Sequence, residues 1–223
     1  MADLIKAKEP FKFYTRLSLS ELTGLRAANL GQLLGIIGEL PIASIYHHTH
    51  RFLQQHQYLS PEPPNDFAYW VSQILGEDEL GELLASIDTM QFFDINSLRD
   101  KIIQTIEIYL KENPTASLRF AREGDEFHFI KSVSFILPTK YTACDLKEFS
   151  EVLRKIAIDS IYFHIFEARL RLEKRTNDFS NWIENSLGNK RLADKITQMD
   201  PYTRTLDDLR KTLIQVIDKE ISV

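Results

Sequence analysis

Four of the six histidines of this 223-residue chain lie close together, at His47, His48, His50 and His56. His47 and His50 are three residues apart, so they share one face if the segment is helical. Neutral imidazole is the commonest metal ligand in proteins, and a carboxylate such as Asp66 could complete a site. The spacing matches no zinc signature such as His-Glu-x-x-His. Two interpretations stay open: a metal or ligand site formed by His47, His50, His56 and Asp66, or ordinary histidines on a polar helix face.

One of these histidines belongs to a motif that occurs twice. Residues 11–48 match residues 127–164 without a gap at an offset of 116, with 11 identities in 38 positions. Average composition would give roughly 2. Ser-Ile-Tyr recurs at 44–46 and 160–162, and His48 recurs as His164. Residues 65–90 then match 177–202 at an offset of 112.

The recurrence separates His48 from its neighbours. His47, His50 and His56 align with Phe163, Phe166 and Leu172, whereas His48 aligns with His164. A histidine that occurs at both positions, each ahead of the same Asn-Asp-Phe, is better explained by a role in the fold. We predict that each is partly buried and hydrogen-bonded to the start of the following helix. The structural motif expected on this basis consists of His48, Asn65, Asp66, Trp70, His164, Asn177, Asp178 and Trp182.

The elements that must position these residues are mostly helical in the sequence pattern. Apolar residues at helical spacing, such as Leu30, Leu33 and Ile37, predict amphipathic helices. Aromatic alternation at 11–13 and 127–129 predicts a short strand or hairpin before the helices. We therefore predict a mainly α protein with two tandem copies of a helical unit of roughly 100 residues. Residues 1–113 and 114–223 are the two units expected, packed with pseudo-twofold symmetry.

Composition excludes several classes of protein. Hydrophobic residues make up 43% and charged residues 26%, which is typical of a globular chain with a core. The net charge of −5 argues against nucleic acid as the partner. A single cysteine, Cys144, excludes an internal disulfide and favours a cytoplasmic location. The sequence has no apolar run of about 18 residues that would span a membrane, and no Gly-rich phosphate loop or Gly-x-Ser-x-Gly elbow.

The repeated segments at 44–50, 64–67, 163–169 and 177–180 resemble an uncharacterised prokaryotic family of tandem-duplicated proteins, a domain of unknown function. The resemblance covers nearly the whole chain and implies no activity. We expect a non-enzymatic protein-interaction or regulatory module that binds a protein, uses no cofactor and has no membrane contact. A homo-oligomer stays open. The alternative is a small helical metal-binding protein or enzyme that uses the histidine cluster.

Overall fold

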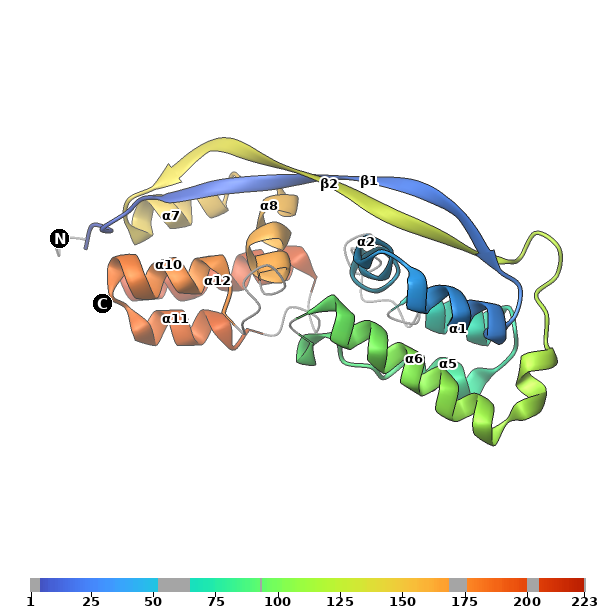
Figure 1. Cartoon of the computed structure of the whole chain (residues 1–223). Coiled ribbons are helices and arrows are strands. Elements are labelled where there is room, and N and C mark those ends of the chain that lie inside the picture. The colour runs from blue at the N-terminus through green and yellow to red at the C-terminus, as the bar shows by residue number, and fades with distance from the viewer. Residues whose placement is uncertain (1–4, 52–64, 93, 169–175, 200–204, 223) are drawn as a thin grey trace. The chain divides into compact units, whose positions relative to one another are not determined.

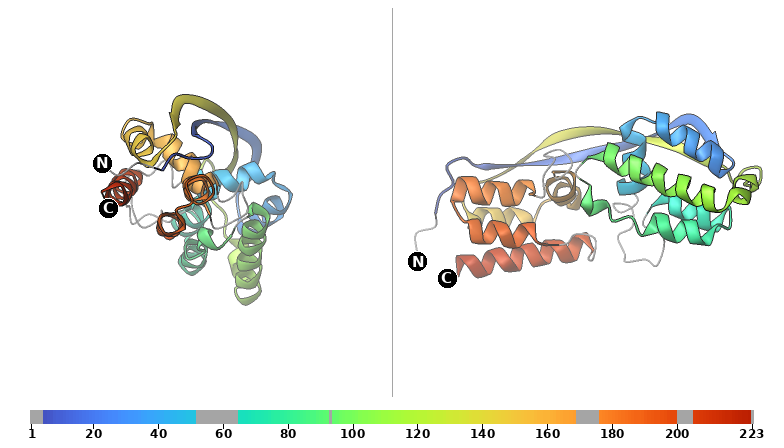
Figure 2. Two further views of the ribbon diagram at one scale, coloured as in Figure 1. Left: turned by 90° about the vertical axis from the view of Figure 1, so that its left-hand side faces the viewer. Right: turned by 60° about the horizontal axis from the view of Figure 1, so that its bottom comes forward.

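The computed structural model describes residues 5–51, 65–92, 94–168, 176–199 and 205–222 (Figure 1). Its sheet has two strands, β1 (Phe11–Ala27) and β2 (Phe127–Ala143), which pair with each other. The Thr23 hydroxyl donates to the carbonyl of Phe129, and the Thr139 hydroxyl donates to the carbonyl of Phe13, each at 2.8 Å. The strands therefore run antiparallel, and Figure 2 shows them side by side.

The described residues form two compact units, and each unit takes residues from both halves of the sequence. Unit 1 contains 5–17, 134–168, 176–199 and 205–222. Unit 2 contains 18–51, 65–92 and 94–133. The first residues of β1 thus belong with helices that lie more than a hundred positions later in the chain.

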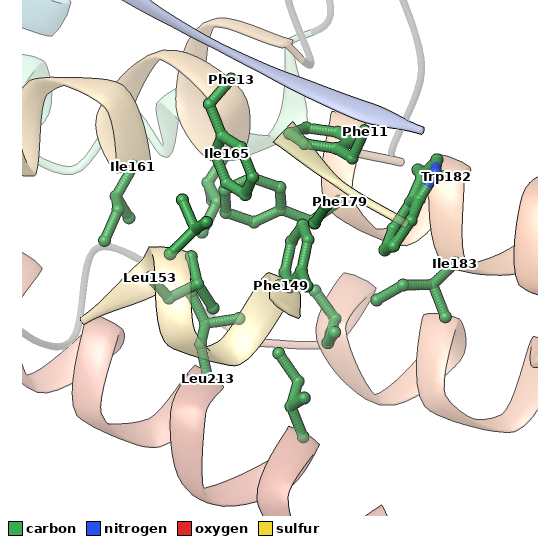
Figure 3. Packing of buried hydrophobic residues seen from close by; sticks show 14 of the residues in the cluster. Phe11, Phe13, Phe149, Leu153, Ile161, Ile165, Phe179, Trp182, Ile183 and Leu213 are labelled. Carbon is green, nitrogen blue, oxygen red and sulfur yellow. The ribbon is translucent and has the colours of Figure 1, made fainter. Parts of the chain in front are cut away.

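Unit 1 packs the start of β1 onto helices of the second half of the sequence (Figure 3). Phe11 and Phe13 are buried, and their ring centroids lie 5.4 and 5.2 Å from that of Phe149. Phe179 and Trp182 complete this aromatic cluster. The helices are α7 (Leu146–Leu153), α8 (Ile158–Tyr162), the π-helix η4 (Phe163–Glu167), α10 (Asp178–Leu187), α11 (Lys190–Thr197) and α12 (Leu206–Ile221).

Unit 2 packs the start of β2 onto helices of the first half of the sequence. Phe127 lies 5.1 Å from Phe67 and 5.7 Å from Trp70 between ring centroids, and Phe129 is fully buried beside it. The α-helices are α1 (Leu30–Glu39), α2 (Ile42–Tyr46), α4 (Asp66–Gln73), α5 (Asp78–Ala85) and α6 (Ile95–Glu112). The other helical segments are the π-helix η1 (His47–Arg51) and the 3-10 helices η2 (Thr89–Gln91) and η3 (Pro114–Leu118).

The predicted fold class, a mainly α protein made of tandem helical repeats, was wrong. The fold is α+β, with two 17-residue strands that pair with each other in place of a short strand or hairpin inside each half. The middle of each strand is exposed on both faces. Its sequence therefore lacks the alternation of apolar and polar residues that indicates a half-buried strand. Among the described residues, no helix is long and apolar enough to cross a membrane.

Candidate functional site

The recurring serine and histidine of unit 1 hold the outer edge of β1. Ser160 lies on α8 and His164 on η4, one helical turn later. The backbone N–H of Tyr14 donates to Nε2 of His164 at 2.9 Å, and the Ser160 hydroxyl donates to the carbonyl of Tyr14. A neighbouring β-strand would satisfy the same two main-chain groups. Two side chains of a helix therefore replace a third strand.

The contacts of His164 determine its protonation. A backbone N–H can only donate, so Nε2 must carry a lone pair. The proton is then on Nδ1, which lies 2.7 Å from Oδ2 of Asp178, the first residue of α10. His164 is consequently a neutral imidazole with both ring nitrogens hydrogen-bonded. The buried ring links the strand to the start of α10.

Unit 2 contains the same arrangement around His48. The backbone N–H of Ile130, on β2, donates to Nε2 of His48 at 2.9 Å, and Nδ1 lies 2.8 Å from Oδ2 of Asp66. The serine differs. The Ser44 hydroxyl is buried and has no hydrogen-bond partner among the described residues. We call each set a strand clamp: Ser160, His164 and Asp178 in unit 1, and Ser44, His48 and Asp66 in unit 2.

The other residues of the predicted motif lie beside the clamps. Asn65 and Asn177 are the N-cap residues of α4 and α10, and their side chains accept from the backbone N–H groups of Ala68 and Ser180. The indole N–H of Trp182 donates to the carbonyl of Glu9 at 2.8 Å. That of Trp70 donates to the carbonyl of Asp125, also at 2.8 Å. Each tryptophan therefore binds the chain just before its strand begins.

The structure places the candidate metal ligands in different surroundings. One ligand atom from each of His47, His48 and Asp66 lies within 4.8 Å of the others. His50 is buried and stacked on Tyr46 at 5.4 Å, and burial lowers its pKa to about 4. His56 lies outside the described residues.

The hydrogen bonds of His48 bear on the metal interpretation. A metal on Nδ1 would require the proton to move to Nε2, where it would oppose the N–H of Ile130. Nδ1 also lies 2.8 Å from Asp66, and Nδ1 of His47 lies 3.1 Å from the hydroxyl of Ser132. The geometry of this cluster therefore favours hydrogen bonding within the fold over metal coordination.

An open cleft of about 800 Å³ lies in unit 1 between the start of β1 and α10. Phe163 and Trp182 contribute apolar surface to it, and the His164–Asp178 pair also lines it. Exposed polar residues at its rim are Glu9, Lys12, Asn181 and Asn185. Sequence reasoning missed this site. The available signal was the pair Asn181 and Asn185, four residues apart on an exposed helix face.

The fold and the two clamps define an α+β protein whose recurring histidines hold strands. The chain belongs to a family of unknown function, DUF5752, whose model matches residues 8–218. The solved structure of OrfY from Thermoproteus tenax is similar, with 30% sequence identity and a TM-score of 0.82. The match covers 99% of this chain and 100% of that chain. No curated protein matches the sequence.

Proposed function

We propose that this protein is a non-enzymatic interaction module that binds another protein. The observation that carries the proposal is the engagement of His48 and His164. Each ring donates to a carboxylate and accepts from a strand N–H, so neither imidazole is available as a general base or nucleophile. The residues that recur in the sequence thus support the fold. We assign the binding of the partner protein to the open cleft of unit 1.

A metal centre in unit 2 is the competing proposal. It is favoured by the proximity of His47, His48 and Asp66. It is opposed by the Ile130 N–H, which holds the proton of His48 on the nitrogen that would have to bind the metal. Metal analysis of the freshly purified chain separates the two. Stoichiometric zinc, iron or manganese that disappears in the His47→Ala variant would support the metal centre and contradict our proposal.

The partner is proposed to be a protein in a reducing, cytoplasmic compartment. The compartment rests on the single, unpaired Cys144. The acidic balance of the chain, −5 at neutral pH, argues against a polyanionic partner such as nucleic acid.

The test is to capture binding proteins from an extract of the cells that express the chain, then purify each candidate and measure its affinity by calorimetry. We expect one candidate to bind with a defined stoichiometry and a dissociation constant at or below the micromolar range. The control is the chain with Phe11→Asp and Phe13→Asp, which destroys the core of unit 1. Equal capture by the control would show that the captured protein does not need a folded unit 1, and no candidate that binds after purification would contradict the proposal.

A further inference from the structure

The edge of β1 that faces away from β2, with the residues just before the strand, is hydrogen-bonded to helical residues on either side of Lys12. The Lys8 N–H donates to the carbonyl of Ser186 at 2.9 Å, and both main-chain groups of Tyr14 are held by His164 and Ser160. In an antiparallel strand, alternate residues direct their N–H and C=O groups to the same side. Lys12 therefore directs its main-chain groups the same way as Tyr14, away from β2. In the described part of the chain, no helix group binds the main chain of Lys12, which lines the cleft.

The facing wall of the cleft presents an amide pair. Asn185 Nδ2 donates to Oδ1 of Asn181 at 2.7 Å. This bond leaves the Nδ2 group of Asn181 as a donor and Oδ1 of Asn185 as an acceptor, neither with a partner among the described residues. Both side chains lie on the exposed face of α10, one turn apart. A donor beside an acceptor is the complement of a peptide group, which offers one C=O and one N–H.

We propose that this cleft binds an extended peptide segment of the partner protein, which adds alongside β1 as a further strand at Lys12. The inference rests on the proposed interaction function and names the ligand class. Lys12 supplies one main-chain donor and one acceptor, and Asn181 and Asn185 bind the next peptide group. Strand addition is an established way of recognising peptides, with main-chain bonds for affinity and side chains for specificity.

Two charged side chains at the rim of the cleft, Lys12 and Glu9, indicate which charges the peptide carries. Neither the Lys12 ammonium nor the Glu9 carboxylate has an ion-pair partner among the described residues, and both are exposed. They are three residues apart, about 10 Å along an extended chain. When one residue both donates a main-chain hydrogen bond to the residue opposite it and accepts one from it, the two strands are antiparallel. The bound segment therefore carries an acidic residue opposite Lys12, followed toward its C-terminus by a basic residue opposite Glu9.

The contact is short, because Pro10 has no N–H to offer the added strand and Tyr14 is already engaged. A segment of about three to five residues is enough to fill the exposed part of the edge. The cleft volume of about 800 Å³ is within the range of pockets that enclose ligands of this size.

The test uses random linear twelve-residue peptides displayed on phage and selected on the full-length chain. The best peptide is synthesised with acetylated and amidated ends, and its affinity is measured by calorimetry. We expect an acidic residue ahead of a basic one, and at least a tenfold loss of affinity for the Asn181→Leu/Asn185→Leu chain. The matched control is Tyr69→Leu/Gln73→Leu, at the corresponding positions of α4 in unit 2, where we expect no change.

A second measurement keeps the proposal testable if the leucine variant does not fold. Methylation of the central amide nitrogens of the peptide, one at a time, should weaken binding to the wild-type chain tenfold at one position. Selection of no binding peptide, or a peptide bound equally by the leucine variant and after every methylation, would overturn the inference. So would a dimer of the chain that is lost in the leucine variant, because the occupant would then be a second copy.

Failure here is distinguishable from failure of the proposed function. A partner protein that binds the wild-type chain and the leucine variant with the same affinity leaves the interaction function intact and removes the cleft as its site. Absence of any partner removes both.

Discussion

Ser160 and Ser44 stand at corresponding positions of the two clamps but differ in their contacts. Ser160 donates to the carbonyl of Tyr14, whereas the buried Ser44 hydroxyl has no partner among the described residues. A buried hydroxyl without a partner costs stability, whereas one that is bonded contributes modestly. Replacement of the serine by alanine should therefore destabilise unit 1 but not unit 2.

We expect Ser160→Ala to lower the free energy of unfolding by about 1 kcal/mol and Ser44→Ala to leave it unchanged or raise it by about 1 kcal/mol. Urea denaturation of the two variants beside the wild type measures both values. Equal losses at the two sites would show that Ser44 also has a favourable contact.

His50 should make the stability of unit 2 depend on pH, whereas the corresponding residue of unit 1 does not titrate. Burial lowers the pKa of His50 to about 4, from 6.5 for a free side chain. A histidine with a lowered pKa stabilises the fold above its unfolded pKa. That contribution is lost as the pH falls from about 6.5 through about 4, because the unfolded chain then binds the proton more tightly. In unit 1 the corresponding residue is Phe166, which stacks on Tyr162 at 4.8 Å.

Substitution of His50 by Phe should remove this pH dependence. We expect the stability of the wild type, relative to His50→Phe, to fall by about 3 kcal/mol between pH 7 and pH 4. Thermal melts of both proteins across this range give the difference. A constant difference would mean that His50 is protonated in the folded protein at the same pH as in the unfolded one.

At the scale of elements, α4 and α5 approach closely at a glycine. A Cβ atom at Gly81 would lie 2.6 Å from Cβ of Ser72 and 3.3 Å from the carbonyl oxygen of Ala68. The contact involves the backbone of α4, so it cannot be relieved by rotating one side chain. At Gly35, in the exposed part of α1, a Cβ would meet nothing within 4 Å.

Gly81→Ala and Gly35→Ala should therefore have opposite effects. The first should destabilise unit 2 by about 1–3 kcal/mol through overpacking. The second should stabilise it by about 0.5–1 kcal/mol, the difference in helix propensity between alanine and glycine. Guanidinium denaturation measures both, and a gain at Gly81 would indicate that the two helices separate easily.

The helices were the predictable elements, because their signals are local. Leu30, Leu33 and Ile37 predict the buried face of α1, and all three are fully buried. Thr205 and Asp208 predict the start of α12, where the Thr205 side chain accepts from the Asp208 N–H. Such signals lie within one or two turns, so they are visible without tertiary structure.

The strands and the cleft were not predictable to the same degree. In β1, Leu17, Leu19 and Leu22 are all about half exposed or more, so no alternation distinguishes the strand from a helix. The clamp joins Tyr14 to His164, and the cleft brings Lys12 close to α10. In both cases the partners lie more than a hundred residues apart in the sequence, so no local pattern reveals the contact. The recurrence predicted that His48 and His164 have the same surroundings, but not which strand each one holds.

At the scale of the whole molecule, each unit contains one of the two tryptophans. Trp182 belongs to unit 1 and Trp70 to unit 2, and each ring packs against a phenylalanine of the strand that its unit binds. Fluorinated tryptophan therefore gives one fluorine NMR signal per unit, which makes it possible to follow the unfolding of each unit separately.

We expect Phe13→Ala to destabilise unit 1 by about 3–5 kcal/mol, the usual cost of emptying an aromatic site in a core. Its effect should appear at the Trp182 signal, although Phe13 and Trp70 are nearer in sequence. Phe129→Ala should act on the Trp70 signal in the same way. Changes at the opposite signals would contradict the assignment of the strands to the units.

The segments of the chain that form each unit are made at different times during synthesis on the ribosome. Residues 18–133 contain the described part of unit 2, so all of that part has been made once residue 133 has left the ribosome. Unit 1 needs residues 5–17 together with helices up to α12, which ends at Ile221, so residues 5–17 must wait for a segment that is made about 200 residues later. Until those later residues are made, Phe11 and Phe13 have no core to enter, and a chaperone that recognises short aromatic segments would bind this protein around Phe11 and Phe13.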